Sequence, residues 1–215
     1  MLILQPKVQH DFMNESYINK KLAILIAIVF ATNLVALVYV MYAGAIMYKL
    51  TIMYKLTPVN FNVGYMILNV GNMILDLPII ISACIIASKK ELYRTNFAKL
   101  FSWIFFGIET FELLNLLSYV IFDIDLGGLM GSSAHIIFPI IFAAATILFY
   151  ATLPMWKPVK IVGIISVLPS IAKFITFGTI VRVNLVLYAA ALILSIIWAL
   201  KKPVVPSMKQ TIDVI

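Results

Sequence analysis

The chain has 215 residues, of which 63% are hydrophobic and 12% are charged, and its mean hydropathy is +1.07. Soluble domains are about 45–50% apolar and about 25% charged, so this composition excludes a soluble globular protein and predicts membrane-spanning helices. The formal net charge of +7 indicates membrane topology and contact with anionic lipid. It does not indicate nucleic-acid binding, because no soluble segment carries a basic patch with interleaved aromatic residues.

The apolar runs predict an all-α, polytopic transmembrane helix bundle that forms one membrane domain over residues 1–215. About 20 apolar residues cross a hydrocarbon layer of about 30 Å, and in lipid they must be helical to satisfy their own backbone. Six spans are predicted: Leu22–Tyr42, Phe61–Ala87, Leu100–Phe122, Ile136–Leu153, Val159–Ile180 and Val183–Leu200. Seven spans remain an alternative. The division between the last two spans rests on Gly178 and Arg182, which interrupt the apolar run in "GTIVRVN".

The polar N-terminal segment, residues 1–20, precedes the first span. Lys20 and Lys21, followed by the apolar run and "AGA", have the outline of a signal peptide. The run is longer than the apolar region of a signal, which has about 7–15 residues, and a long polar segment stands before it. We therefore expect an uncleaved first span, which has room to continue into "AIMYKL".

A tandem hexapeptide, "IMYKLTIMYKLT", occupies residues 46–57. A step of six residues turns an α-helix through about 240°, so the two copies do not share a face. We interpret the repeat as a local duplication that lengthens the first outer connection, with Tyr48 and Tyr54 at the membrane interface. A ligand-binding role is the alternative.

The basic residues predict the orientation of this layout. With the N-terminus in the cytoplasm, Lys49, Lys55 and Arg182 lie outside and Lys173 lies within a span. The other 12 of the 16 Lys and Arg residues are cytoplasmic: Lys7, Lys20, Lys21, Lys89, Lys90, Arg94, Lys99, Lys157, Lys160, Lys201, Lys202 and Lys209. The positive-inside rule therefore predicts that both termini, including the tail at 201–215, are cytoplasmic.

Polar residues interrupt the second and third spans at steps of three and four, which places them on one face of each helix. Two of them are acids only three residues apart, near the middle of the third span. Together with the one basic residue well inside a span, the candidate site residues are Glu109, Glu112, Asp76, Asn72, Asn69, Asn115 and Lys173.

A carboxyl group near the middle of a membrane-spanning helix has an unfavourable insertion free energy. Each acid costs about 2.5–3.5 kcal/mol to insert at the centre of a spanning helix, so Glu109, Glu112 and Asp76 must face protein or water. Two adjacent carboxyl groups in a low dielectric are expected to share a proton. We expect the polar faces of the second and third spans to pack against each other around a site for protons, a cation or a small solute. Interhelical hydrogen bonding is the alternative, and it is favoured for the asparagines.

Lys173 lies about 10 Å from the outer end of the fifth span. Its side chain has two alternatives. It extends to the outer interface, or it forms an ion pair with Glu112 or Asp76. Pro169, four residues earlier, would loosen the helix near it.

No enzyme chemistry assembles from the remaining residues. "GLMGSSAHIIF" resembles the serine region of rhomboid proteases, but that family needs a later histidine and none follows His135. Cys84 is the only cysteine, and His10 is the only other histidine, which excludes disulfides, thiolate metal sites and paired haem ligands within the bundle. Glycine loops for nucleotides are absent. We predict no catalytic residues, metal or cofactor.

Two segments, "GNMILDLPIIISACIIASKKELYRTNFAKLFSWIFFGIETFELLNLL" and "KPVKIVGIISVLPSIAKFIT", resemble a family of bacterial and archaeal membrane proteins of unknown function. These proteins are of similar length and have six or seven helices. The shared features are an aspartate in the second helix, a basic inner loop, an acid in the third helix, and a later helix start of the form P-x-x-x-G. Here that start is Pro158, with Gly163 one step beyond the pattern. The resemblance implies a topology and a prokaryotic cytoplasmic membrane, without an activity.

The leading functional hypothesis is transport, or proton- or cation-linked conduction, through the buried polar core. The alternative is a non-catalytic subunit or assembly partner of a larger membrane complex, in which the acids pair with a helix of another subunit.

Overall fold

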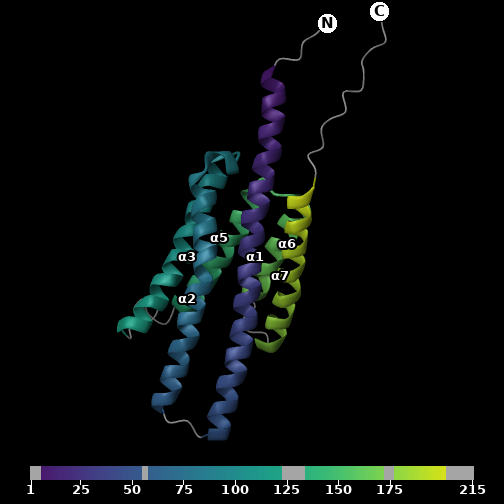
Figure 1. The fold of residues 1–215 in the computed structure, drawn as a ribbon. Coiled ribbons are helices and arrows are strands. Elements are labelled where there is room, and N and C mark those ends of the chain that lie inside the picture. Colours follow the sequence, from purple (N-terminus) through teal and green to yellow (C-terminus); the bar gives the residue numbers. More distant parts are fainter. Residues whose placement is uncertain (1–5, 55–57, 123–133, 172–176, 202–215) are drawn as a thin grey trace, which may run out of the picture.

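The computed structural model describes residues 6–54, 58–122, 134–171 and 177–201, and near several helix ends it describes the backbone alone. All regular structure in these ranges is helical, which confirms the all-α part of the predicted fold class (Figure 1). A short 3₁₀ helix, η1 (Lys90–Leu92), follows α2. The α-helices are α1 (Pro6–Tyr54), α2 (Pro58–Ser88), α3 (Asn96–Phe122), α5 (Ala134–Thr152), α6 (Lys157–Ile171) and α7 (Phe177–Leu200).

Local chemistry explains several helix boundaries. Pro58 opens α2, a position where the missing N–H of proline costs nothing. Thr95 caps α3, because its Oγ1 accepts a hydrogen bond from the Ala98 N–H at 3.1 Å. Pro78 and Pro139 lie inside α2 and α5. Such prolines are tolerated in membrane helices because neighbouring groups satisfy the freed carbonyls.

The helices pack in a closed ring. Each α-helix packs against two others, in the order α1, α2, α3, α5, α6, α7 and back to α1. The first and last helices of the chain therefore lie side by side (Figure 1). This arrangement allows side chains from all six helices to meet near one central axis.

Four helices contain a stretch that is long and apolar enough to cross a membrane: Lys20–Ile46, Leu68–Ser88, Asn96–Phe122 and Arg182–Leu200. They correspond to the first, second, third and sixth predicted spans. The apolar part of α5, Ile137–Thr152, is shorter, and α6 has only 15 residues. At 1.5 Å per residue α6 is about 22 Å long, less than the hydrocarbon thickness of about 30 Å. The structure thus supports a membrane protein with four helices of spanning length.

The break between the last two helices lies earlier than predicted. Helix α6 ends at Ile171 and α7 begins at Phe177, so Gly178 and Arg182 belong to α7. The interruption in the apolar pattern therefore does not mark a helix boundary. Arg182 is exposed and lies close to the start of α7, where a long basic side chain can extend its charge to water.

Helix α1 extends beyond the predicted first span at both ends and has 49 residues. The first copy of the tandem hexapeptide (46–51) and the first half of the second copy (52–54) continue this helix. The repeat therefore lengthens a helix where we expected a connection. Residues 55–57 lie outside the described part of the chain.

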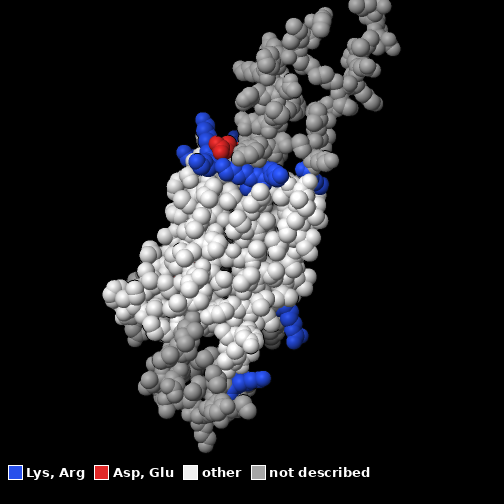
Figure 2. All heavy atoms as spheres, viewed as in Figure 1, with Lys and Arg blue, Asp and Glu red and all other residues white. Residues whose placement is uncertain are grey.

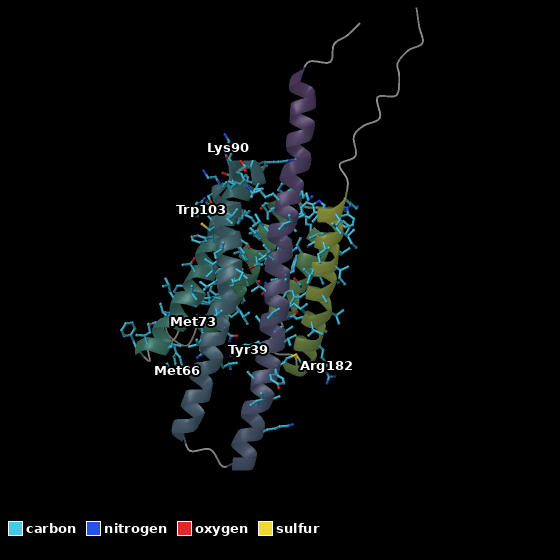
Figure 3. All side chains as sticks on the ribbon, in the orientation of Figure 1. Tyr39, Met66, Met73, Lys90, Trp103 and Arg182 are labelled. Atoms are coloured by element: carbon cyan, nitrogen blue, oxygen red, sulfur yellow. The ribbon has the colours of Figure 1, made fainter. Side chains whose placement is uncertain are left out.

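Basic side chains gather at one end of the ring, which we call the basic end (Figure 2). This end is formed by the start of the apolar part of α1, the α2–α3 connection, the start of α6 and the end of α7. Its described members are Lys20, Lys21, Lys89, Lys90, Arg94, Lys99, Lys157, Lys160 and Lys201. Among the described side chains, only Lys49 and Arg182 stand toward the other end, which we call the opposite end. Figure 3 shows Lys90 and Arg182 at these two ends.

Contacts between segments hold the basic end together. The Lys21 Nζ lies 3.5 Å from a Glu91 carboxylate oxygen. The Lys201 Nζ lies 3.6 Å from the centre of the Trp156 ring, a cation–π contact that joins the end of α7 to the start of α6. The Lys160 ammonium donates to the Ala151 carbonyl at 2.9 Å. That carbonyl is in the last turn of α5, where a cation complements the helix dipole.

Candidate functional site

Glu109 is the middle residue of α3, about 20 Å along the helix axis from either end. Its side chain is partly buried. One turn toward the basic end, Phe105 lies on the same face of α3 and is 2% exposed. Glu109 therefore belongs to the face of α3 that turns into the ring, at mid-depth of the structure.

Each of the other five helices contributes one residue to a set linked to Glu109. Asp76, Tyr150 and Tyr188 lie within electrostatic range of Glu109, and Phe30 and Gly163 lie against Tyr150. Three of these residues are aromatic, one is an acid and one is a glycine. In ring order, with Glu109, the set is Phe30 (α1), Asp76 (α2), Glu109 (α3), Tyr150 (α5), Gly163 (α6) and Tyr188 (α7). We call this set the central cluster.

The aromatic members of the central cluster pack on one another. The Phe30 and Tyr150 rings stack, with centroids 5.5 Å apart and an interplanar angle of 18°. The Tyr188 ring lies 6.5 Å from Phe30. A Cβ on Gly163 would stand 3.2 Å from the Phe30 Cζ and 3.4 Å from the Tyr150 Cγ. A glycine at this position therefore lets both rings lie against the backbone of α6.

Glu109 is the electrostatic centre of the cluster. The carboxyl groups of Asp76 and Glu112 lie within electrostatic range of Glu109. The phenol groups of Tyr150 and Tyr188 also lie within its range. Neighbouring carboxylates repel one another when all are ionised, and an apolar surrounding strengthens that repulsion. Glu109, two neighbouring acids and two phenols therefore form one electrostatically coupled group.

A second aromatic stack lies one helical turn from Glu109, toward the basic end. The Phe105 and Phe149 rings have centroids 4.2 Å apart and an interplanar angle of 12°. Phe149 is fully buried and also contacts the Tyr150 ring at 5.3 Å. This stack joins α3 to α5 and separates the central cluster from the basic end along α3.

The structure places the candidate residues of the sequence analysis in different surroundings. Asp76 and Glu109 lie in the central cluster. Asn69 is buried, and Asn72 and Asn115 are partly buried. Glu112 is exposed. It is about 60° around the helix from Glu109, and its carboxyl group lies within electrostatic range of Glu109.

Lys173 and its two alternatives lie outside the described residues. Helices α2 and α3 do pack together, but the central cluster also draws residues from the other four helices.

Three buried serines and the Asn33 amide form hydrogen bonds within their own helices. Ser102 donates to the Ala98 carbonyl at 2.7 Å, and Ser195 and Ser166 donate to carbonyls of their own helices in the same way. The Asn33 amide likewise donates to the Val29 carbonyl at 2.9 Å. These contacts satisfy polar groups locally, so they supply none of the interhelical hydrogen bonding considered from the sequence.

Sequence reasoning missed four members of the central cluster and one further polar residue. Phe30 and Gly163 carry no recognisable signal in an apolar helix. Tyr150 and Tyr188 do carry one, because a phenol within a spanning helix needs a polar neighbour. Asn184 is buried in α7, at 7% exposure, and was passed over as part of a helix boundary.

Within the described ranges, no group of three or more His, Cys, Asp or Glu residues stands close enough to hold a metal ion. Comparison of the chain with protein-family models, with curated proteins and with solved structures finds no match.

Proposed function

We propose that this protein is a multi-pass integral membrane protein that moves protons or a small cation through the centre of its helix ring, with Glu109 as the binding group. The observation that carries this proposal is the central cluster itself. A carboxyl group at mid-depth of a membrane helix is costly to maintain unless it binds something. Glu109 has two other acids, Glu112 and Asp76, and two phenols within electrostatic range.

The chemistry of the cluster suits a proton best. A carboxyl group accepts and releases a proton without moving its helix, and a phenol both donates and accepts a hydrogen bond. Tyr150 and Tyr188 approach Glu109 from α5 and α7, so they offer two neighbours through which a proton can arrive or leave. A dehydrated cation would instead be held by Glu109 and Asp76 together.

The proposed topology follows from the basic end. Its side chains face the cytoplasm, as the positive-inside rule requires, and both termini lie on that side of a prokaryotic cytoplasmic membrane. All six helices cross the membrane in this proposal. The shorter helices α5 and α6 then require local thinning of the bilayer or interfacial anchoring by flanking side chains.

One observation favours a second function. Glu112 is an exposed acid near the middle of α3, and it lies within electrostatic range of Glu109. A carboxyl group there fits contact with a polar or basic residue on a helix of another subunit. In this alternative the protein is a non-catalytic partner in a larger membrane complex.

Proteoliposomes containing a pH-sensitive dye test the first proposal. Under an imposed potential, we expect the wild-type protein to conduct protons and Glu109→Gln to fall to the level of empty liposomes. Glu91→Gln is the matched control, because it removes an exposed carboxylate at the basic end. Glu112→Gln is expected to reduce flux less than Glu109→Gln does.

Two results would count against conduction. One is a wild-type flux equal to that of empty liposomes, with the protein folded and monodisperse. The other is an undiminished flux in Glu109→Gln. If the chain also loses its fold unless other membrane proteins copurify with it, the partner-subunit function is the better account.

A further inference from the structure

Burial along the ring axis is uneven on the two sides of the central cluster. In α1, α2, α3 and α7, every described apolar side chain that is buried lies at the level of the cluster or toward the basic end. These side chains are Leu22, Ala23, Leu25, Ile26, Val29, Phe30, Ile79, Ala83, Ile86, Ala87, Ala98, Phe105, Ala191 and Trp198. The basic half of these four helices is therefore filled mainly by hydrocarbon and by the Phe105–Phe149 stack. Its buried polar residues are Ser82, Ser102 and Ser195, and Ser102 and Ser195 donate to carbonyls of their own helices.

On the side of the opposite end, the buried side chains described in the same four helices are polar, whereas α5 and α6 contribute the buried apolar residues Ala143, Ala145 and Val167. Thr32 is 8% exposed, Asn69 6% and Asn184 7%. Asn69 lies two turns from Asp76, and a step of seven residues keeps it on the same face of α2. Asn184 lies one turn from Tyr188 on the same face of α7. The buried polar groups thus continue from the central cluster toward the opposite end.

Asn184 has a polar atom with no protein partner. Its Oδ1 is buried and has no hydrogen-bond partner within the described part of the chain. A buried acceptor without a donor costs about 1–3 kcal/mol, and nearly all such atoms in proteins are bonded to protein or water. A water molecule satisfies such an atom where the surroundings are polar and offer it two or more partners.

We propose that Asn184 holds water in an aqueous route that connects the opposite end of the ring to Glu109. Tyr188 is the link between them, because it lies one turn from Asn184 and within electrostatic range of Glu109. The Phe105–Phe149 stack closes the basic side. As a transport path the route rests on the proposed function, and it gives Glu109 access to one side of the membrane only.

Cysteine labelling tests this access without any flux measurement. Cys84 is the only cysteine, so Cys84→Ser provides a cysteine-free background. The probe is a membrane-impermeant, positively charged methanethiosulfonate, which reacts with a thiolate in water. The test variant is Asn184→Cys. The matched control is Ala191→Cys, which lies on the same face of α7, two turns toward the basic end, and is fully buried.

Two exposed positions report the side from which the reagent acts. Arg182→Cys marks the opposite end and Lys90→Cys marks the basic end (Figure 3). We expect Asn184→Cys to be labelled only from the side that labels Arg182→Cys. Ala191→Cys should react about 100-fold more slowly from either side, because an apolar environment disfavours the thiolate. In a denaturing detergent both variants should label completely.

Equal protection of Asn184→Cys and Ala191→Cys in the folded protein would overturn the proposal, and so would labelling of Asn184→Cys from the side of Lys90→Cys. If Asn184→Cys does not fold, Thr32→Cys tests the same route from α1. The experiments can refute the access route and the conduction function independently of each other. Labelling of Asn184→Cys together with normal flux in Glu109→Gln keeps the route and removes the function. Protection of Asn184→Cys together with lost flux in Glu109→Gln keeps the conduction function and removes the access route.

Discussion

Truncation of Phe105 tests whether the aromatic stack beneath Glu109 holds α3 to α5. Phe105→Ala removes one ring of a pair whose centroids are 4.2 Å apart, and both residues are almost fully buried. The unfolded helices remain in an apolar solvent, so transfer from water contributes little. The cost arises from the cavity, of order 100 Å³ at about 24 cal/mol per Å³, and from about 1 kcal/mol of ring contact. We expect the free energy of unfolding to fall by about 3 kcal/mol.

The free energy of unfolding is measured by titrating the protein from a mild detergent into a denaturing one, with helicity as the signal. Phe97→Ala is the matched control, because Phe97 is on the same helix and is 69% exposed. That variant leaves no cavity, so its unfolding midpoint should move little. The double variant Phe105→Ala/Phe149→Ala should cost less than the two single variants together, by about 0.5–1.5 kcal/mol.

The reasoning is refuted if Phe105→Ala costs no more than Phe97→Ala. That result would mean that the rings do not form the contact between α3 and α5, and the closed basic side of the ring would have no physical basis. Strict additivity in the double variant would refute the direct stacking of the two rings, while leaving their burial intact.

Two further stability predictions follow from single contacts. The Tyr39 ring lies where a Cβ on Gly71 would stand, so Gly71→Val should destabilise the α1–α2 contact by about 1–3 kcal/mol. Tyr39→Ala in the same chain should recover most of that loss in the same detergent titration, and no recovery would contradict the predicted overlap. Lys160→Met removes the ammonium that donates to the Ala151 carbonyl, and should cost about 0.5–1 kcal/mol. Lys157→Met, an exposed neighbour, should cost less, and an equal loss would show that the Ala151 contact contributes nothing specific.

Composition and apolar run length were sufficient to predict the helical class and the four helices of spanning length. These properties are local, since a run of apolar residues meets its own backbone hydrogen bonds only as a helix in lipid. The clustering of basic residues at one end also follows from the sequence, once the apolar runs are taken to cross from side to side. The break between the last two helices was predicted near Gly178, later in the chain than the observed break between Ile171 and Phe177. The reason is that one glycine and one exposed arginine interrupt an apolar pattern without ending a helix.

The acids at Glu109 and Glu112 show the limit of reasoning from spacing. A spacing of three residues places them on neighbouring parts of one helix surface, so the sequence alone predicts the same environment for both. Only the packing of α3 against α2 and α5 leaves Glu109 partly buried and Glu112 exposed. A rotation of about 60° separates these surroundings, and periodicity does not specify rotation to that accuracy in a helix that is apolar on nearly every side.

The sequence by itself determined that this chain is a helical membrane protein with costly acids near the middle of its third span. The tertiary structure decided what surrounds them. Phe30, Tyr150, Gly163 and Tyr188 come from helices far apart along the chain. They pack together because α1 and α7 close the ring, and the two phenols lie within electrostatic range of Glu109. The physical reason is that helix formation depends on neighbours in sequence, whereas the surroundings of a buried charge depend on which helix faces pack together.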